Sequence, residues 1–239
     1  MNPVIAAHNL KVVRGGKLIL RVDELAVEKG QVLAVVGPNG AGKTCLLHTL
    51  ALLEPPASGT VRLFDVDAFN GNQLALRRRM ALVFQEPLLL DTTVKRNITL
   101  PLRMRGISGR EANARSDRWL HRFGIGSLSA RSARALSGGE AQRTSLARAF
   151  AMEPEILLLD EPFTALDYPT RKSLVDELGE VLKEMNLTTV FVTHDYSEIP
   201  PLTEQVAVLF DGRIVKRGSS REIFGEDFLK KKSYAPWET

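Results

Sequence analysis

A run of eight residues has the pattern G-x-x-x-x-G-K-[ST], and its members are Gly37, Pro38, Asn39, Gly40, Ala41, Gly42, Lys43 and Thr44. Glycines lack a Cβ atom, so the backbone N–H groups of such a loop can converge on phosphate oxygens. The ammonium group of Lys43 would reach the β- and γ-phosphates, and the hydroxyl of Thr44 would ligate Mg²⁺. The run therefore predicts a site for a nucleoside triphosphate.

The elements on either side of this loop are those that such a site requires. Residues 31–36 are predicted to form a buried strand and residues 43–53 a helix, whose positive dipole end would face the phosphates. The backbone N–H of Cys45 is expected to face the α-phosphate, and its side chain is expected to pack rather than to act in redox chemistry. The order of strand, loop and helix argues against a glycine turn that carries a lysine by chance.

A second glycine-rich motif, Leu136-Ser137-Gly138-Gly139-Glu140, precedes a helix predicted over residues 138–152. Serine favours the N-cap position, and exposed N–H groups together with the helix dipole form an anion site there. The loop that contains Lys43 already accounts for the phosphates of one nucleotide. The second motif is therefore best explained as contacting a nucleotide held by another copy of the chain.

Two acids follow an apolar strand predicted over residues 156–159. Asp160 would bind Mg²⁺ directly or through water, and Glu161 would orient or deprotonate the attacking water. The alternative is that both acids cap the loop at Pro162.

Two further polar residues stand at predicted strand ends. Gln85 follows residues 80–84 and could contact both the metal and the water, and His194 follows residues 188–193, where it could contact the γ-phosphate. Taken alone, Gln85 also suits ordinary polar surface and His194 a structural role. Their functional interpretation depends on the other motifs.

The composition fits one large globular domain. The chain has 239 residues, 44% of them hydrophobic, and a formal net charge of +4, which does not demand a nucleic-acid partner. The single cysteine excludes an intramolecular disulfide framework. The apolar runs are too short to span a membrane, and the first residues lack the basic start and long apolar run of a signal peptide. Any membrane role is expected to come through a partner.

The predicted elements indicate an α/β fold with a mainly parallel sheet and right-handed crossovers. Between about residues 91 and 150 the strand-like runs give way to helical composition, so a helical subdomain is expected within a single domain of residues 1–239. The other predicted strands and helices are residues 4–13 and 18–27 (a small N-terminal antiparallel sheet), strands 60–64 and 206–209, and helices 109–123 and 171–185.

The order of these motifs resembles the nucleotide-binding subunit of ATP-binding-cassette (ABC) transporters, over residues 4–224. The set comprises the phosphate loop, Gln85, the motif at residues 136–140, Asp160-Glu161-Pro162, Ala165-Leu166-Asp167 and His194. The resemblance implies that two copies form a head-to-tail homodimer, with each ATP between the phosphate loop of one and the second glycine motif of the other. It also implies that residues 165–167 cross the dimer interface and that residues 85–105 receive a membrane subunit.

Three departures from the family pattern bear on expectations. Glu140 ends the second motif, where glutamine is commonest. The aromatic residue expected to stack on adenine is missing, and Arg14, whose planar guanidinium can stack on a base, is the candidate in its place. No regulatory C-terminal domain is expected, and so no feedback through one; the lysines at residues 230–232 are expected to be solvated surface.

The resemblance implies an ATPase that uses ATP and Mg²⁺ to power transport through separate integral membrane permease subunits. Residues 92–102 resemble importers, so we expect an extracytoplasmic substrate-binding protein and a cytoplasmic subunit peripheral on the inner face of the membrane. An oxyanion such as tungstate is favoured as substrate, although amino-acid importers share this form. Export or lipid release is an alternative. A cassette acting on nucleic acid or ribosomes is another, but such proteins fuse two cassettes or insert long coiled coils, so no direct nucleic-acid contact is expected.

Overall fold

A six-stranded sheet forms the centre of the computed structural model, which describes residues 3–225. Its order is β10-β9-β3-β8-β7-β6. All neighbouring pairs are parallel except β9 and β10. The mainly parallel sheet predicted from the sequence is therefore confirmed. Its strands are β3 (Val32–Val36), β6 (Met80–Val83), β7 (Ile156–Asp160), β8 (Thr188–Thr193), β9 (Gln205–Phe210) and β10 (Arg213–Ser219).

Strand β3, and β7 up to Asp160, are apolar without interruption because the sheet is covered on both faces. In β7, Leu157 and Leu159 point into one hydrophobic core, while Ile156 and Leu158 point into another. The first core is shared with the helical part of the chain, and the second with the N-terminal sheet and the helix after the phosphate loop. The polar residue of this buried strand is Asp160, at its carboxyl end.

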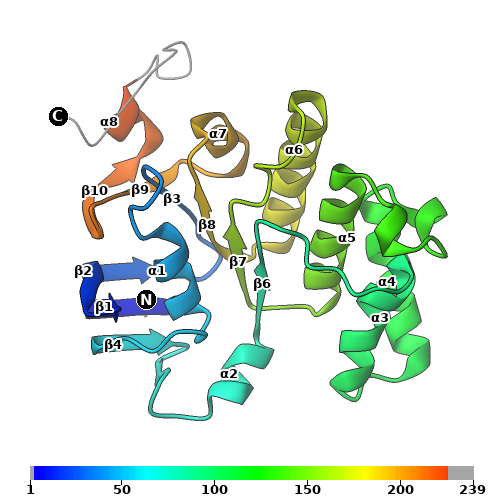
Figure 1. Ribbon diagram of the computed structural model, residues 1–239, viewed down its shortest axis with the longest axis horizontal. Coiled ribbons are helices and arrows are strands. Elements are labelled where there is room, and N and C mark those ends of the chain that lie inside the picture. Colours follow the sequence, from blue (N-terminus) through cyan, green and yellow to red (C-terminus); the bar gives the residue numbers. More distant parts are fainter. Residues whose placement is uncertain (1–2, 226–239) are drawn as a thin grey trace.

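The predicted N-terminal antiparallel sheet is also confirmed, in the order β2-β1-β4-β5. It lies at the opposite end of the molecule from the helical lobe described below (Figure 1). The tip of the β1–β2 hairpin contains Gly15 and Gly16, both with positive φ. Its strands are β1 (Ile5–Arg14), β2 (Lys17–Val27), β4 (Ser58–Leu63) and β5 (Val66–Asp67).

Three helices, α3 (Val94–Met104), α4 (Gly109–Arg122) and α5 (Gly138–Ala151), form the helical lobe. Trp119 stacks on Phe150 with a ring-centroid distance of 4.9 Å, and Phe123 lies 5.6 Å from Phe150, so aromatic packing joins α4 to α5. The other helices are α1 (Lys43–Leu50), α2 (Gln73–Arg78), α6 (Tyr168–Met185), α7 (Ile199–Leu202) and α8 (Ser220–Phe224), with single 3₁₀ turns η1 (Gly126–Leu128), η2 (Ala133–Ala135) and η3 (Tyr196–Glu198). No helix within residues 3–225 has both the length and the apolar composition of a membrane span.

Several element boundaries differ from the sequence predictions. The helix after the phosphate loop ends at Leu50 rather than at residue 53, because the chain turns through Leu52, which has a φ of 60°. Helix α6 begins at Tyr168 rather than at residue 171, since the Asp167 side chain accepts a hydrogen bond from the N–H of Thr170 and caps it. Strand β10 and helix α2 were not predicted. The lysines at residues 230–232 lie outside the described residues.

Candidate active site

The carboxyl ends of four neighbouring parallel strands, β3, β8, β7 and β6, meet at one edge of the central sheet. This edge is where open α/β sheets bind ligands. The loops that leave these strands line a cavity of about 550 Å³. The cavity is lined by Arg14, Ile19, Asn39, Gly40, Gly42, Lys43, Thr44, Cys45, Gln85, Glu161, Thr164 and His194. Segments more than 100 residues apart in the sequence are thus brought to one site.

The backbone conformation of the phosphate loop requires glycine at Gly37 and Gly42. A Cβ atom on Gly37 would lie 2.0 Å from the carbonyl oxygen of Leu209, so no larger residue fits there. Gly42 holds the N-cap position of α1 with a φ of 99° and has no side chain to cap the helix. The N–H groups of the first turn of α1 are therefore left for another acceptor, and the helix dipole favours an anion.

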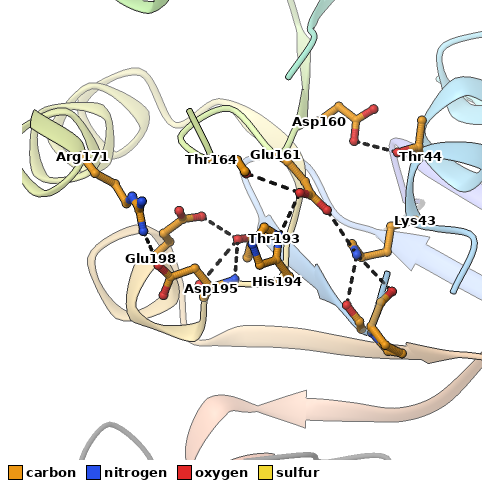
Figure 2. A network of polar contacts seen from close by, with 12 residues as sticks. Lys43, Thr44, Asp160, Glu161, Thr164, Arg171, Thr193, His194, Asp195 and Glu198 are labelled. Carbon is orange, nitrogen blue, oxygen red and sulfur yellow. Dashed lines mark hydrogen bonds and ion pairs between the residues drawn. The ribbon is translucent and has the colours of Figure 1, made fainter. Parts of the chain in front are cut away.

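The side chain of Lys43 is held at the loop rather than in solvent. It is 5% exposed, and its Nζ donates to the carbonyl oxygens of Gly37, at 3.0 Å, and Pro38, at 3.2 Å. Its third contact is an ion pair of 3.2 Å with Glu161 Oε1 (Figure 2). A cation buried in this way favours an anionic ligand in the loop.

Thr44 and Asp160 place two oxygens side by side. The hydroxyl of Thr44 donates to Asp160 Oδ1 at 3.1 Å, and Asp160 is 5% exposed. Burial raises the pKa of Asp160 above its ordinary value, while the hydrogen bond from Thr44 acts in the opposite direction. A buried carboxylate beside a hydroxyl fits a hard cation such as Mg²⁺, which takes one or two protein oxygens together with phosphate oxygens.

The carboxylate of Glu161 connects residues from three different segments of the cavity wall. Its Oε2 lies 2.8 Å from His194 Nδ1 and accepts a hydrogen bond of 3.3 Å from Thr164, while Oε1 pairs with Lys43 (Figure 2). Its φ of 44° lies in the left-handed region, which costs a residue with a Cβ atom about 1–3 kcal/mol. The N–H of Glu161 donates to the carbonyl of Val192 at 3.0 Å, which helps to hold this backbone conformation.

Four other residues line the cavity, and only two of them were predicted from the sequence to be part of the site. Gln85 and His194 lie in its wall, as their positions at strand ends suggested. Thr164 and Ile19 also line it, although neither was singled out. Thr164 lies three residues beyond Glu161, and this short spacing is the only signal that could have found it. Ile19 arrives from β2 in the other sheet, and no motif marks it.

Arg14 and Cys45 share a neighbour at the rim of the cavity. The guanidinium of Arg14 forms a two-pronged ion pair with Glu54, and its Nε lies 2.6 Å from Glu54 Oε1. The thiol of Cys45 is buried, and burial raises its pKa to about 11. A thiol with this pKa is a poor nucleophile at neutral pH, and the residue serves as a small packed side chain. The side chain of Arg14 is 50% exposed, and the residue lines the cavity.

The second glycine motif lines a different cavity, of about 520 Å³, which shares no lining residue with the first. Ser137 is the N-cap of α5 and accepts a hydrogen bond from the N–H of Glu140 at 3.3 Å. The Glu140 carboxylate in turn accepts from the N–H of Ser137 at 2.7 Å, and these bonds lower the pKa of Glu140. Gly138 and Gly139 add their backbone to the wall, together with the segment at residues 165–167.

A buried acid, Glu198, lies beneath the loop that carries His194. It is 3% exposed and accepts a hydrogen bond of 2.6 Å from the hydroxyl of Thr193 (Figure 2). Burial raises the pKa of Glu198 to about 7, against an ordinary value of 4.5, and the bond from Thr193 only partly offsets this. Glu198 therefore binds a proton more tightly in the native protein than in the unfolded chain.

This raised pKa predicts a pH-dependent stability. The stabilisation from the protonated carboxyl is complete below pH 4.5 and is lost as the pH rises to about 7. We expect Glu198→Gln, which mimics the protonated acid, to raise the free energy of unfolding at pH 8 by up to about 3 kcal/mol and to change it little at pH 4.5. Urea unfolding at both pH values measures this. The exposed Glu204→Gln is the control, and an effect of Glu198→Gln that is equal at both pH values would contradict the assignment.

The sequence matches the ABC transporter family over residues 20–164, which is more than half of the chain. The chain belongs to the ABC transporter family. As an ATP-binding subunit of that family, it is an ATPase. It is 35% identical over 223 residues to the phosphate import ATP-binding protein PstB 2 of Natronomonas pharaonis, covering 88% of this chain and 78% of that protein.

Two other similarities place the chain within the ABC family. It is 39% identical over 210 residues to the methionine import ATP-binding protein MetN 1 of Pseudomonas putida, covering 86% of this chain but only 63% of that relative. Among solved structures, the ATP-binding cassette MJ0796, dimeric in a post-hydrolysis state with ADP and Pi, matches with a TM-score of 0.81 at 28% identity. That match covers 90% of this chain and 98% of the cassette. The α/β fold with an antiparallel N-terminal sheet is thus that of ABC ATPases.

Proposed function

We propose that two copies of this subunit close around two ATP molecules, and that hydrolysis reopens them to drive transport through separate membrane subunits. The observation that carries this proposal is the presence of two unconnected cavities, each of about 500 Å³. One contains the phosphate loop and the acids, and the other contains Ser137 and Gly138. A single chain would use only one of them on its own nucleotide, whereas a head-to-tail pair would use both. The dimeric relative bound to ADP and Pi supports this arrangement.

The residues of the first cavity have distinct proposed roles toward the nucleotide. The backbone of residues 37–44 and the N–H of Cys45 bind the phosphates, with Lys43 on the β- and γ-phosphates. Arg14, oriented by Glu54, stacks on the base. The oxygens of Thr44, Asp160 and Gln85 would hold Mg²⁺, which would neutralise charge on the phosphates.

The contacts of Glu161 suit it to act on the attacking water. Its carboxylate orients the water and accepts its proton, while the water oxygen bonds to the γ-phosphorus and the bond to the β–γ bridging oxygen breaks. ADP leaves with the electron pair of that bond. His194, 2.8 Å from Glu161, holds the carboxylate in place and contacts the γ-phosphate. Lys43 stabilises the charge that develops on the phosphoryl oxygens.

From the partner copy, residues 137–140 would complete the site. Their helix N-terminus would face the γ-phosphate, and residues 165–167 would cross the interface beside them. Hydrolysis removes the γ-phosphate and with it these contacts, so the closed dimer is favoured only while ATP is bound. This difference between the two states supplies the mechanical step.

Exposed apolar side chains between residues 88 and 104 support docking to a membrane subunit. Leu88, Leu90 and Leu100 are 55%, 47% and 39% exposed, and Met104 is 78% exposed. Several large apolar side chains left exposed along one stretch of the chain favour a protein partner. We therefore place the subunit in the cytoplasm on the inner face of the membrane, bound through permease subunits, with an extracytoplasmic substrate-binding protein in the complex. The whole chain, residues 1–239, would act as one domain with a helical subdomain at about residues 91–150.

The second glycine motif provides a test of the composite site. Ser137→Arg should leave ATP binding to the monomer within about twofold of the wild type, because Ser137 does not line the cavity that holds the phosphate loop. It should abolish ATP-dependent dimer formation, since a long cation would fill the space meant for the γ-phosphate of the partner. Isothermal titration and light scattering measure the two effects. Loss of ATP binding by the monomer would contradict the proposal that Ser137 contacts the nucleotide of the partner copy.

A mixture of two variants sharpens this test. In a Glu161→Gln background, Lys43→Ala disables the phosphate loop and Ser137→Arg disables the second motif. Neither variant alone should dimerise with ATP. Mixed together they should form a heterodimer, because the loop of one and the motif of the other then make one intact site. Absence of that heterodimer would contradict a site shared between copies.

We propose import of an oxyanion such as tungstate as the transport activity. The support is the similarity to a relative named for phosphate, another oxyanion. A relative named for methionine is similar to a comparable degree, so uptake must be measured for both classes. Cells lacking this gene should lose uptake of labelled tungstate and regain it with the wild type but not with Glu161→Gln. Loss of methionine uptake alone would overturn the oxyanion assignment.

A further inference from the structure

Arg171 contacts two loops that have separate roles in the proposed cycle. Arg171 lies near the start of α6, and its Nη1 donates to Asp195 Oδ2 at 2.7 Å. Its Nη2 donates to the carbonyl oxygen of Leu166 at 2.9 Å (Figure 2 labels Arg171 and Asp195). Leu166 is the middle residue of the segment at residues 165–167, and Asp195 follows His194. The two arms of the guanidinium thus hold a loop at the γ-phosphate side and a loop at the interface side.

The loop after β8 is held in turn by short local hydrogen bonds. Asp195 accepts from the N–H and the hydroxyl of Ser197, at 3.0 and 2.6 Å, and its own N–H donates to the hydroxyl of Thr193 at 3.0 Å. His194 and Asp195 are neighbours, yet His194 bonds to Glu161 and Asp195 to Arg171. A shift of this loop would therefore change the contacts of the Glu161 carboxylate and of Arg171 at the same time.

The geometry points to Arg171 as a positioning residue that couples the His194 loop to the interface segment at residues 165–167. This inference rests on the proposed function. An arginine suits the task because its planar fork presents two donors in a fixed relation, which a flexible ammonium group does not. The ion pair is only partly exposed, with side-chain exposures of 26% for Arg171 and 29% for Asp195, so solvent screens it incompletely. Docking of the partner copy on residues 165–167 would then favour the His194 position that hydrolysis needs, and ATP in the cavity would favour docking.

The test measures coupling rather than stability. In the Glu161→Gln background, Arg171→Ala should leave ATP affinity of the monomer within about twofold but weaken ATP-dependent dimerisation about tenfold, within the 5–150-fold range usual for coupling between sites. With Glu161 intact, Arg171→Ala should reduce the Hill coefficient for ATP to about 1, in a hydrolysis assay where the wild type exceeds 1. Arg171→Lys, which keeps the charge without the fork, should not restore either property fully. Lys172→Ala, the neighbouring exposed cation on α6, is the matched control.

Asp195→Asn provides a second variant that is milder toward folding. It keeps an acceptor but loses the ion pair, and it should weaken dimerisation in the same direction. The effects of Arg171→Ala and Asp195→Asn on the dimerisation constant should fall short of additive, because both variants remove the same ion pair. Additive effects, or unchanged dimerisation and cooperativity in Arg171→Ala, would overturn the inference. If the Glu161→Gln parent does not dimerise with ATP, the proposed function fails first and this inference falls with it.

Discussion

Lys43→Ala should lower the rate of ATP hydrolysis by at least about 100-fold and weaken ATP binding. Removal of one preorganised donor from a site of developing charge typically costs 10²–10³ in rate, and Lys43 would also contact the ground-state phosphates. Its burial beside the loop carbonyls means that no nearby solvent cation replaces it. Steady-state phosphate release and equilibrium titration with ATP measure the two effects.

The control for this variant is Lys183→Ala, which removes an exposed lysine from α6, remote in the fold from the phosphate loop. It should hydrolyse ATP at the wild-type rate. Turnover by Lys43→Ala within a few-fold of the wild type would refute the assignment of the phosphate loop.

Glu161→Gln should slow hydrolysis by about 10²–10⁴, the usual contribution of general acid–base catalysis. ATP binding should be retained, because the amide keeps the shape of the side chain and removes only its charge and basicity. The two variants therefore separate binding from chemistry: Lys43→Ala affects both, whereas Glu161→Gln affects the chemical step. Single-turnover hydrolysis measured beside ATP titration distinguishes them.

An exposed acid provides the matched control for Glu161. Glu24→Gln, on the solvent side of β2, removes one negative charge without altering the cavity and should leave turnover unchanged. If Glu161→Gln retained wild-type turnover, the base would have to be sought elsewhere among the cavity residues, and the proposed chemistry would be wrong.

The parts of the fold that follow from local patterns could be predicted from the sequence. Strand β7 is an unbroken apolar run because the sheet is covered on both faces, and the phosphate loop is marked by the strand before it and the helix after it. Strand β10 escaped prediction because it is an antiparallel edge strand with several charged residues, including Arg213, Lys216 and Arg217, and lacks an apolar run. The early start of α6 depends on the Asp167 cap, which sequence periodicity does not show.

The residues of the site likewise divide into those that local sequence patterns predict and those that they do not. Gln85, Asp160 and His194 each stand at the end of a predicted strand, and parallel topology alone brings such positions together. Pairs between remote segments, such as Arg171 with Asp195, have no local signature, because their meeting depends on how the whole chain folds. The ion pair between Arg14 and Glu54 escaped prediction for the same reason.

Light scattering after size-exclusion chromatography of Glu161→Gln, with and without ATP, tests the central claim most directly. EDTA limits residual turnover during the run. The account predicts a monomer without ATP and a dimer with it, and the added Ser137→Arg substitution should return the ATP-bound sample to monomer. A monomer under every condition, or a dimer that the Ser137→Arg substitution does not affect, would contradict a nucleotide shared between two copies of this chain.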